Sequence, residues 1–361
     1  LAPGGDVQSF QITPDSSRVV YSVTQNADYY VVELYSVPIA GGPSTRLNAL
    51  LVGNTEFLLS PDSGRVVYRA EPSGVVELYS VPITGGVPIK LNAPLPSGAY
   101  VHGSRASSNP GPQISPDSSQ VVYRAGTDQV VQLFSVPIDG GSAVRIDFGA
   151  QGYLSYIALS PDSSRVVYYQ GGTLYSAPLT GGTSVPLNTG GFVYRRVDDV
   201  GFEIDAASSR VVYLSDQETS GLVELFSVPL TGGASVKLNG PLAPGSPTWF
   251  DFELSPDASR VVYFTDQDTT FFDELYSVPI AGGAAQKLSA GEGVYYYQVS
   301  PDSSHVVYLG IQDGTYEMDS VPIDGGSPPT QLNEPLDPGV HVVRFEIAPD
   351  SAGVVYNTIQ S

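Results

Sequence analysis

The chain has 361 residues, no cysteine, and a formal net charge of −21 from 37 acidic and 16 basic residues. The negative charge argues against nucleic acid and anionic membrane surfaces as partners, because their phosphate groups would be repelled. The absence of cysteine excludes disulfides, thiolate metal sites and a cysteine nucleophile, and the absence of a run of about 18 apolar residues argues against membrane insertion.

A nine-residue motif, Ser-Pro-Asp-Ser-Ser-Arg-Val-Val-Tyr, is complete at residues 160–168, and near-copies run from end to end. Its Val-Val-Tyr core ends at Tyr21, Tyr68, Tyr123, Tyr168, Tyr213, Tyr263, Tyr308 and Tyr356. A second motif, Leu-Tyr-Ser-Val-Pro-Ile followed by Gly-Gly and Leu-Asn, lies between consecutive copies, first at residues 34–48. Repeats of 45 to 55 residues that are rich in strands predict a β-propeller with one four-stranded blade per repeat.

Within each repeat, four strands A to D are expected in chain order. Strand A alternates apolar and polar residues, as around Phe10 and Ile12, and Ser-Pro-Asp-Ser then suits a type I turn. Strands B and C, such as residues 165–168 and 274–279, are almost continuously apolar, as expected when blades cover both faces. Gly-Gly predicts a hairpin with a primed turn before strand D, and the proline of strand C is expected at a strand end.

The repeat count predicts how the chain ends. Eight A–B hairpins but only seven C–D hairpins are present, so residues 341–360 should form a two-stranded half-blade beside the first blade. We therefore expect one domain over residues 1–361, with seven four-stranded blades and this half-blade. The outer strand, residues 354–358, would present unpaired backbone groups to a protein partner, to a second copy in self-assembly, or to upstream residues.

The Ser-Pro-Asp turn, the Leu-Tyr and Gly-Gly elements and the terminal Leu-Asn resemble the TolB-type, WD40-like propeller family over essentially the whole chain. The chain departs from that family in having Ser-Ser where glycine usually follows the aspartate. The resemblance implies a propeller fold in a periplasmic scaffold, a peptidase gating domain or a lyase. Together with the first residue Leu1 and the low lysine content, it leads us to expect an extracellular, cell-surface or periplasmic protein.

The B–C and D–A loops vary most in length and should share one face of the propeller. Variable loops on a rigid scaffold commonly carry function, so their aromatic and charged residues predict a binding face for a protein or a glycan. The alternative is that the tyrosines cap the blade ends. The residues of this predicted face are Tyr100, His102, Arg105, Tyr156, Arg195, Arg196, Trp249, Tyr295 and Tyr296.

Two B–C loops resemble part of a calcium-binding loop. Asp216, Glu218 and Ser220 are followed by Gly221, and this spacing can converge oxygen ligands on one ion. Asp266 and Asp268 repeat the acidic pair without the glycine. The alternative is ordinary turns with solvated charges. No other cofactor is expected.

No catalytic residues are predicted. The three histidines come from different repeats, His305 takes a position filled by arginine in five repeats, and no nucleophile motif or phosphate loop is present. The sequence favours a non-enzymatic, exported propeller that acts as a protein-binding or structural subunit of a cell-surface or extracellular assembly. The alternatives are the propeller domain of an enzyme, of the peptidase or polysaccharide lyase type, and a glycan-binding propeller.

Overall fold

The structure is a computed structural model. It describes residues 5–24, 32–48, 56–104, 110–147, 154–194, 201–242, 251–268, 273–290, 293–312, 314–337 and 339–360. Within these ranges every regular element is a β-strand, and no helix is long and apolar enough to cross a membrane. The chain divides into two compact units, Leu1–Gly171 with Tyr175–Val185, and Gly172–Leu174 with Pro186–Ser361. The expectation of one domain stays a prediction.

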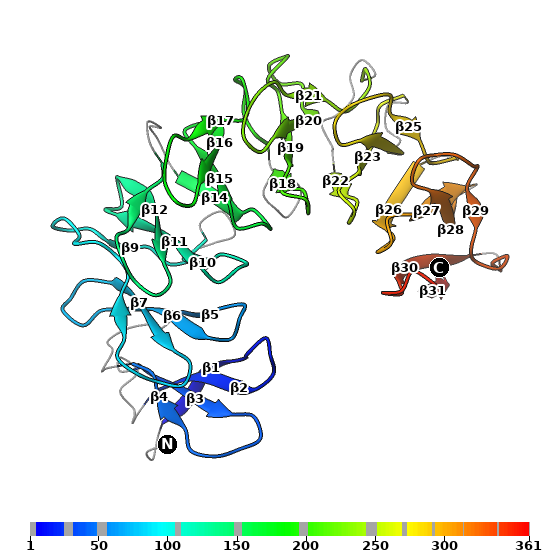
Figure 1. Ribbon diagram of the computed structural model, residues 1–361. Helices are drawn as coiled ribbons and strands as arrows, with labels where there is room; N and C mark the ends of the chain where they lie inside the picture. Colours follow the sequence, from blue (N-terminus) through cyan, green and yellow to red (C-terminus); the bar gives the residue numbers. More distant parts are fainter. Residues whose placement is uncertain are drawn as a thin grey trace. The chain divides into compact units, whose positions relative to one another are not determined.

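Unit 1 holds three complete sheets and most of a fourth (Figure 1). The first two sheets are β1 (Asp6–Ile12), β2 (Arg18–Thr24), β3 (Val32–Pro38), β4 (Thr45–Arg46), and β5 (Phe57–Leu59), β6 (Arg65–Ala70), β7 (Glu77–Pro82), β8 (Ile89–Lys90). The third is β9 (Tyr100–Val101), β10 (Gln113–Ile114), β11 (Gln120–Gly126), β12 (Val131–Pro137), β13 (Val144–Arg145). The fourth, which extends across the unit boundary, is β14 (Leu154–Leu159), β15 (Arg165–Gln170), β16 (Thr173–Pro178), β17 (Val185–Pro186).

Unit 2 continues the same pattern. Its fifth and sixth sheets are β18 (Phe202–Ile204), β19 (Arg210–Ser215), β20 (Glu224–Pro229), β21 (Val236–Lys237), and β22 (Asp251–Leu254), β23 (Arg260–Thr265), β24 (Glu274–Pro279), β25 (Gln286–Lys287). The seventh is β26 (Gly293–Val299), β27 (His305–Gln312), β28 (Thr315–Pro322), β29 (Thr330–Gln331). A two-stranded sheet follows, with β30 (Val340–Ile347) and β31 (Val354–Gln360).

Each sheet is a predicted blade. Its strands pair in chain order, and the described pairings are antiparallel. The third blade carries one additional strand, β9, which pairs with β11. The prediction of seven four-stranded blades and a C-terminal half-blade is confirmed. The predicted position of the half-blade beside the first blade stays a prediction.

Within each unit, consecutive blades share an apolar core. Between blades 1 and 2, Val20, Leu34 and Leu47 of strands B, C and D pack against the next blade. That next blade contributes Phe57, Val66, Tyr68, Val81 and Ile83, among others. Because a middle strand is covered on both faces, Val66 and Val67 are both almost fully buried. This packing explains the continuous apolar runs of strands B and C.

The A–B turn links neighbouring blades. Ser63 N–H donates to Ser60 O over 2.8 Å, and Asp62 Oδ1 accepts hydrogen bonds from Ser60 Oγ and Gly64 N. Ser63 has φ of 61°, in the left-handed region that favours glycine. Its hydroxyl accepts the N–H of Asp15 in the preceding blade at 3.0 Å. Glycine has no hydroxyl, so this bond gives a reason for the departure from the family pattern.

The same bond recurs between other blades. The described pairs of aspartate N–H and serine hydroxyl are Asp62 with Ser118, Asp117 with Ser163, Asp257 with Ser303, and Asp302 with Ser351.

The C–D connection confirms one prediction and corrects another. Pro38 is the last residue of β3, as expected for a residue without an N–H. Gly41 and Gly42 have φ of 90° and 132°, but Ile39 and Ala40 inside the 38–41 turn do not have positive φ. The prediction of a primed two-residue turn is therefore wrong. The glycines follow the turn and redirect the chain toward a short strand D.

Strand D is held by the asparagine of Leu-Asn. Asn48 Oδ1 accepts the N–H of Leu34 at 2.8 Å, and Asn92 does the same for Leu78 at 2.8 Å. The side chain therefore continues the pairing beyond a two-residue strand.

Candidate binding surfaces

The half-blade, β30 and β31, packs on blade 7. Val342 and Phe345, each 1% exposed, form a core with Val307 and Met318 of β27 and β28. The hydroxyl of Ser351 accepts the N–H of Asp302 at 3.1 Å, as in the other blade contacts. The A and B strands of the half-blade are thus seated as in a full blade. Among the described residues, β31 pairs only with β30.

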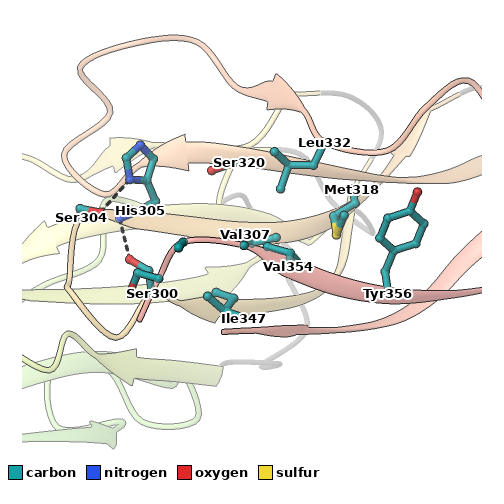
Figure 2. Close-up of a pocket in the computed structure, with 13 residues that line it drawn as sticks. Ser300, Ser304, His305, Val307, Met318, Ser320, Leu332, Ile347, Val354 and Tyr356 are labelled. Atoms are coloured by element: carbon teal, nitrogen blue, oxygen red, sulfur yellow. Dashed lines mark hydrogen bonds between the residues drawn. The ribbon is translucent and has the colours of Figure 1, made fainter. Parts of the chain in front are cut away.

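A cavity of about 360 Å³ lies where blade 7 meets the half-blade (Figure 2). Figure 2 shows Ser304 and His305 at one end and Met318 and Tyr356 at the other. Leu332, which follows strand D of blade 7, borders the cavity and is 41% exposed. The corresponding Leu47, Leu91 and Leu288 are 1–2% exposed. The last blade therefore has an apolar position that remains uncovered.

His305 borders this cavity at a position that is arginine in five other blades. In blade 6 the Arg260 Nε donates to Ser277 Oγ at 2.7 Å, and four other blades have the same arginine–serine pair. In blade 7, His305 Nδ1 instead lies 2.8 Å from Ser304 Oγ. The equivalent serine, Ser320, borders the cavity and is only partly buried. His305 begins β27, as its alignment with the arginines predicted.

Strand β31 exposes two large apolar side chains on the half-blade. Val355 is 73% exposed and Ile359 is 56% exposed, whereas Val20, Val67 and Val262 at the position of Val355 are 0–1% exposed. The difference arises because a following blade covers that position elsewhere.

The predicted face around Tyr100 lies in the loop before blade 3. The ring centroids of Tyr100 and His102 are 4.3 Å apart, and the Tyr100 hydroxyl donates a hydrogen bond to Asp128 Oδ1. His102 is 7% exposed, so little of it can meet a ligand. The buried Arg124 anchors this loop by donating to Pro110 O at 3.1 Å. Arg105 lies outside the described residues.

The predicted tyrosines of blade 7 form a more open surface. Tyr295 and Tyr296, 64% and 38% exposed, follow an irregularity in β26. With Asp251 and Glu253 they border a shallow pocket of about 200 Å³.

The rings of these tyrosines contact aromatic residues of other strands. The ring centroids of Tyr295 and Tyr316 are 5.4 Å apart, and those of Tyr296 and Phe345 of the half-blade are 5.2 Å apart. Local sequence patterns missed these partners because pairing between distant strands brings them together.

Tyr156 is the other described residue of the predicted face. Tyr156 lies in β14, has φ of 47° and contacts Tyr169 with ring centroids 6.3 Å apart. Arg195, Arg196 and Trp249 lie outside the described residues.

The first calcium-like loop is closed by its own hydrogen bonds. Asp216 accepts the N–H groups of Gly221 at 2.8 Å and Phe192 at 2.6 Å, and these bonds lower the pKa of its carboxyl. Glu218 forms an ion pair with Lys237 at 2.8 Å. No hydrogen bond or ion pair of Ser220 is described.

In the second loop, Asp273 lies near the carboxylates of Asp266 and Glu274. Asp266 is 2% exposed, and burial together with the charges of Asp266 and Glu274 raises the pKa of Asp273. The Oδ2 atom of Asp268 lies 3.6 Å from Lys287 Nζ. Among the described residues, no group of three or more histidine, aspartate or glutamate side chains is arranged to hold a metal. Calcium binding stays a prediction.

No protein-family profile matches the sequence, and no curated protein matches it. Dipeptidyl peptidase 4 of Porphyromonas gingivalis is similar in structure, with a TM-score of 0.57 and 11% identity over 91% of this chain. The match covers 52% of the peptidase, so the chain spans about half of its length. A structure of a eukaryotic initiation factor gives a TM-score of 0.56 at 14% identity, over 99% of this chain and 82% of that one.

A putative TolB from Agrobacterium tumefaciens is also among the matches. It is 18% identical over 80% of this chain and 82% of its own, with a TM-score of 0.32. The successive four-stranded sheets and the two closer likenesses establish the architecture. The chain has a β-propeller fold, with seven four-stranded blades and a half-blade.

Proposed function

We propose that this chain is a non-enzymatic, exported propeller that binds a protein partner through its half-blade, within a cell-surface, extracellular or periplasmic assembly. The observation that carries the proposal is strand β31, which pairs on one side only among the described residues and has exposed Val355 and Ile359.

The composition of β31 supports this proposal. Its seven residues, Val-Val-Tyr-Asn-Thr-Ile-Gln, include no charge and no proline. Natural edge strands commonly carry lysine, proline or a short length that prevents association with another chain. A long uncharged edge without such protection suits the addition of a strand from a partner.

The charge of the chain indicates the kind of partner. With a net charge of −21, the chain favours association with basic protein surfaces and steers them by long-range attraction.

Site-specific photo-cross-linking in the source cells tests the proposal. We expect p-benzoylphenylalanine at Thr358 in β31 to cross-link one discrete protein, and Val355→Lys to abolish the product. The same group at Val87, which is 84% exposed in the C–D loop of blade 2, is the matched control. Cell fractionation in the same experiment tests export. A cross-link equal at both positions, or a protein confined to the cytoplasm, would contradict the proposal.

A second candidate is the non-catalytic propeller part of a longer peptidase. The likeness to dipeptidyl peptidase 4, of which this chain spans about half, favours it. In that case the product cross-linked at Thr358 would be a hydrolase domain, and its dipeptide-releasing activity would change when the chain is added.

A further inference from the structure

We infer that the strand received by β31 carries the pattern of the chain's own strand C: an aromatic residue, one intervening residue, then valine, proline and isoleucine. This inference rests on the proposed function and specifies the chemistry of the partner at the same site. The cavity between blade 7 and the half-blade is the place that two of these side chains would fill.

The other blade contacts show what normally fills this place. Between blades 1 and 2, Val81 at the end of strand C and Ile83 just after it pack on Leu47. Val136 and Ile138, Val278 and Ile280, and Val321 and Ile323 occupy the same place in later contacts. These valines are 0–1% exposed and the isoleucines 5–7%. The valine and isoleucine of strand C therefore cover the preceding blade's strand D.

The half-blade has no strand C among the described residues, and the positions normally covered by it remain open. Leu332, equivalent to Leu47, is 41% exposed instead of 1%. The cavity of about 360 Å³ extends from Leu332 to Val354 and Tyr356, the half-blade residues that face blade 7 (Figure 2). An incoming valine and isoleucine would restore the core that the preceding blades have.

Strand register specifies the aromatic position. In blade 2, Tyr68 of strand B pairs with Tyr79 of strand C, and Val66 pairs with Val81. The two tyrosine rings stack with centroids 5.7 Å apart, and five other blades have such a pair at 5.4–5.8 Å. Transferred to β31, this register places an aromatic residue opposite Tyr356 and valine opposite Val354.

The intervening residue is less constrained. In most blades it is a serine bound by an arginine of strand B, as Ser80 is by Arg65 at 2.7 Å. Gly353 stands at the position of that arginine in the half-blade. Selection at β31 therefore depends on the aromatic, valine and isoleucine positions.

We assign the source of the strand to the protein partner proposed above. The seven described strand C elements, β3, β7, β12, β16, β20, β24 and β28, already have a neighbour on each side within their own sheets. Among the described residues, a folded second copy of this chain therefore has no free strand C to donate. The partner therefore contributes an extended segment of its own.

A peptide with the sequence of residues 273–289, which includes strands C and D of blade 6, tests the inference by fluorescence anisotropy. We expect saturable binding to the 361-residue chain. The same peptide with Val278→Ser and Ile280→Ser should bind at least about ten-fold more weakly, because the cavity would lose its two apolar occupants.

Two variants of the protein place the binding site. Leu332→Trp should fill the cavity and weaken binding of the unsubstituted peptide by about ten-fold or more, with the melting temperature unchanged because the site is 41% exposed. Ile39→Trp is the matched control, since Ile39 is 53% exposed on blade 1, and it should leave binding unchanged.

The outcomes separate this inference from the proposed function. If both peptides bind equally well to the unsubstituted protein and neither binds to Val355→Lys, the strand C pattern is wrong but strand addition to β31 is still supported. No binding by either peptide, with a persistent cross-link at Thr358, would also overturn the pattern but not the function. If neither the peptides nor the cross-link gives a signal, both are wrong.

Discussion

The serine after Ser-Pro-Asp keeps an unfavourable backbone conformation for the sake of a bond between blades. Ser118, with φ of 62°, accepts the N–H of Asp62 in the preceding blade at 3.0 Å. Left-handed backbone costs a residue other than glycine about 1 kcal/mol, and a hydrogen bond contributes about as much. The two effects nearly cancel, so serine and glycine can both occupy the turn.

Ser118→Ala should therefore lower the free energy of unfolding by about 1 kcal/mol, because the bond is lost and the backbone cost remains. Ser118→Gly should stay close to the unsubstituted chain, since it loses the bond but relieves the backbone. Urea denaturation measures both, with the exposed Ser73→Ala as control. Equal losses in the alanine and glycine variants would show that φ at residue 118 has no role.

The aspartates of the same turns should make the free energy of unfolding depend on pH. Hydrogen bonds from the Ser60 hydroxyl and the Gly64 N–H lower the pKa of Asp62. Bonds from Thr13 and Ser17 lower the pKa of Asp15 to about 2, and bonds from Ser300 and Ser304 do so for Asp302. A lowered folded-state pKa stabilises the charged form, so its contribution is complete above the unfolded pKa of 3.8 and disappears as the pH falls through the folded pKa.

Asp62→Asn keeps an acceptor but removes the charge, so it should be less stable than the unsubstituted chain at pH 6. The difference in melting temperature should shrink as the pH falls below 3.8 and through the lowered folded-state pKa of Asp62. Thermal denaturation from neutral to acid pH measures it, and comparison at each pH cancels the effect of overall charge. A difference that does not shrink toward acid pH would mean that the asparagine changes packing instead.

At the scale of a single blade, strand B of blade 7 differs from its neighbours at His305. His305→Arg should let the guanidinium donate to Ser320, as Arg260 donates to Ser277 at 2.7 Å. We expect the free energy of unfolding to rise by about 1 kcal/mol, and Arg260→His to lower it by at least as much. Chemical denaturation of the two variants measures this. No gain from His305→Arg would show that the half-blade contact prevents the arginine–serine geometry.

The B–C loop of blade 5 is the element on which calcium binding depends. If the ion binds the folded loop, 5 mM calcium should raise the melting temperature above that in a chelator, through mass action. Asp216→Asn should remove the shift while retaining most of the loop hydrogen bonds. Identical curves in calcium and chelator would mean that the Asp216 carboxylate serves only to accept the N–H groups of Phe192 and Gly221.

Over the whole molecule, the charge imbalance should oppose the compact state. With 37 acidic and 16 basic residues, screening by salt reduces self-repulsion. The melting temperature at pH 7 should therefore rise between 10 mM and 200 mM sodium chloride. A lower value in the higher salt would mean that surface ion pairs such as Glu218 with Lys237 outweigh the repulsion.

The sequence by itself determined the order of the four strands in each repeat, because the repeat specifies each hairpin through local signals, but it did not predict the additional strand β9 of blade 3. Ser-Pro-Asp turns, proline at the ends of strand C and the unequal hairpin count predicted seven blades and the half-blade of β30 and β31. Alternation along strand A predicted the strand but not its burial, since Phe57 is 4% exposed and the equivalent Phe10 is 66% exposed.

Only the tertiary structure decided what the repeated and variable residues do. The bond from Asp15 to Ser63 joins residues 48 positions apart, and the cavity beside Leu332 exists because strands of two blades meet there. The predicted face around Tyr100 contains a largely buried His102, and the calcium-like Asp216 turns toward backbone N–H groups. Strand register and packing between distant segments set these environments, so a pattern of neighbouring residues does not contain them.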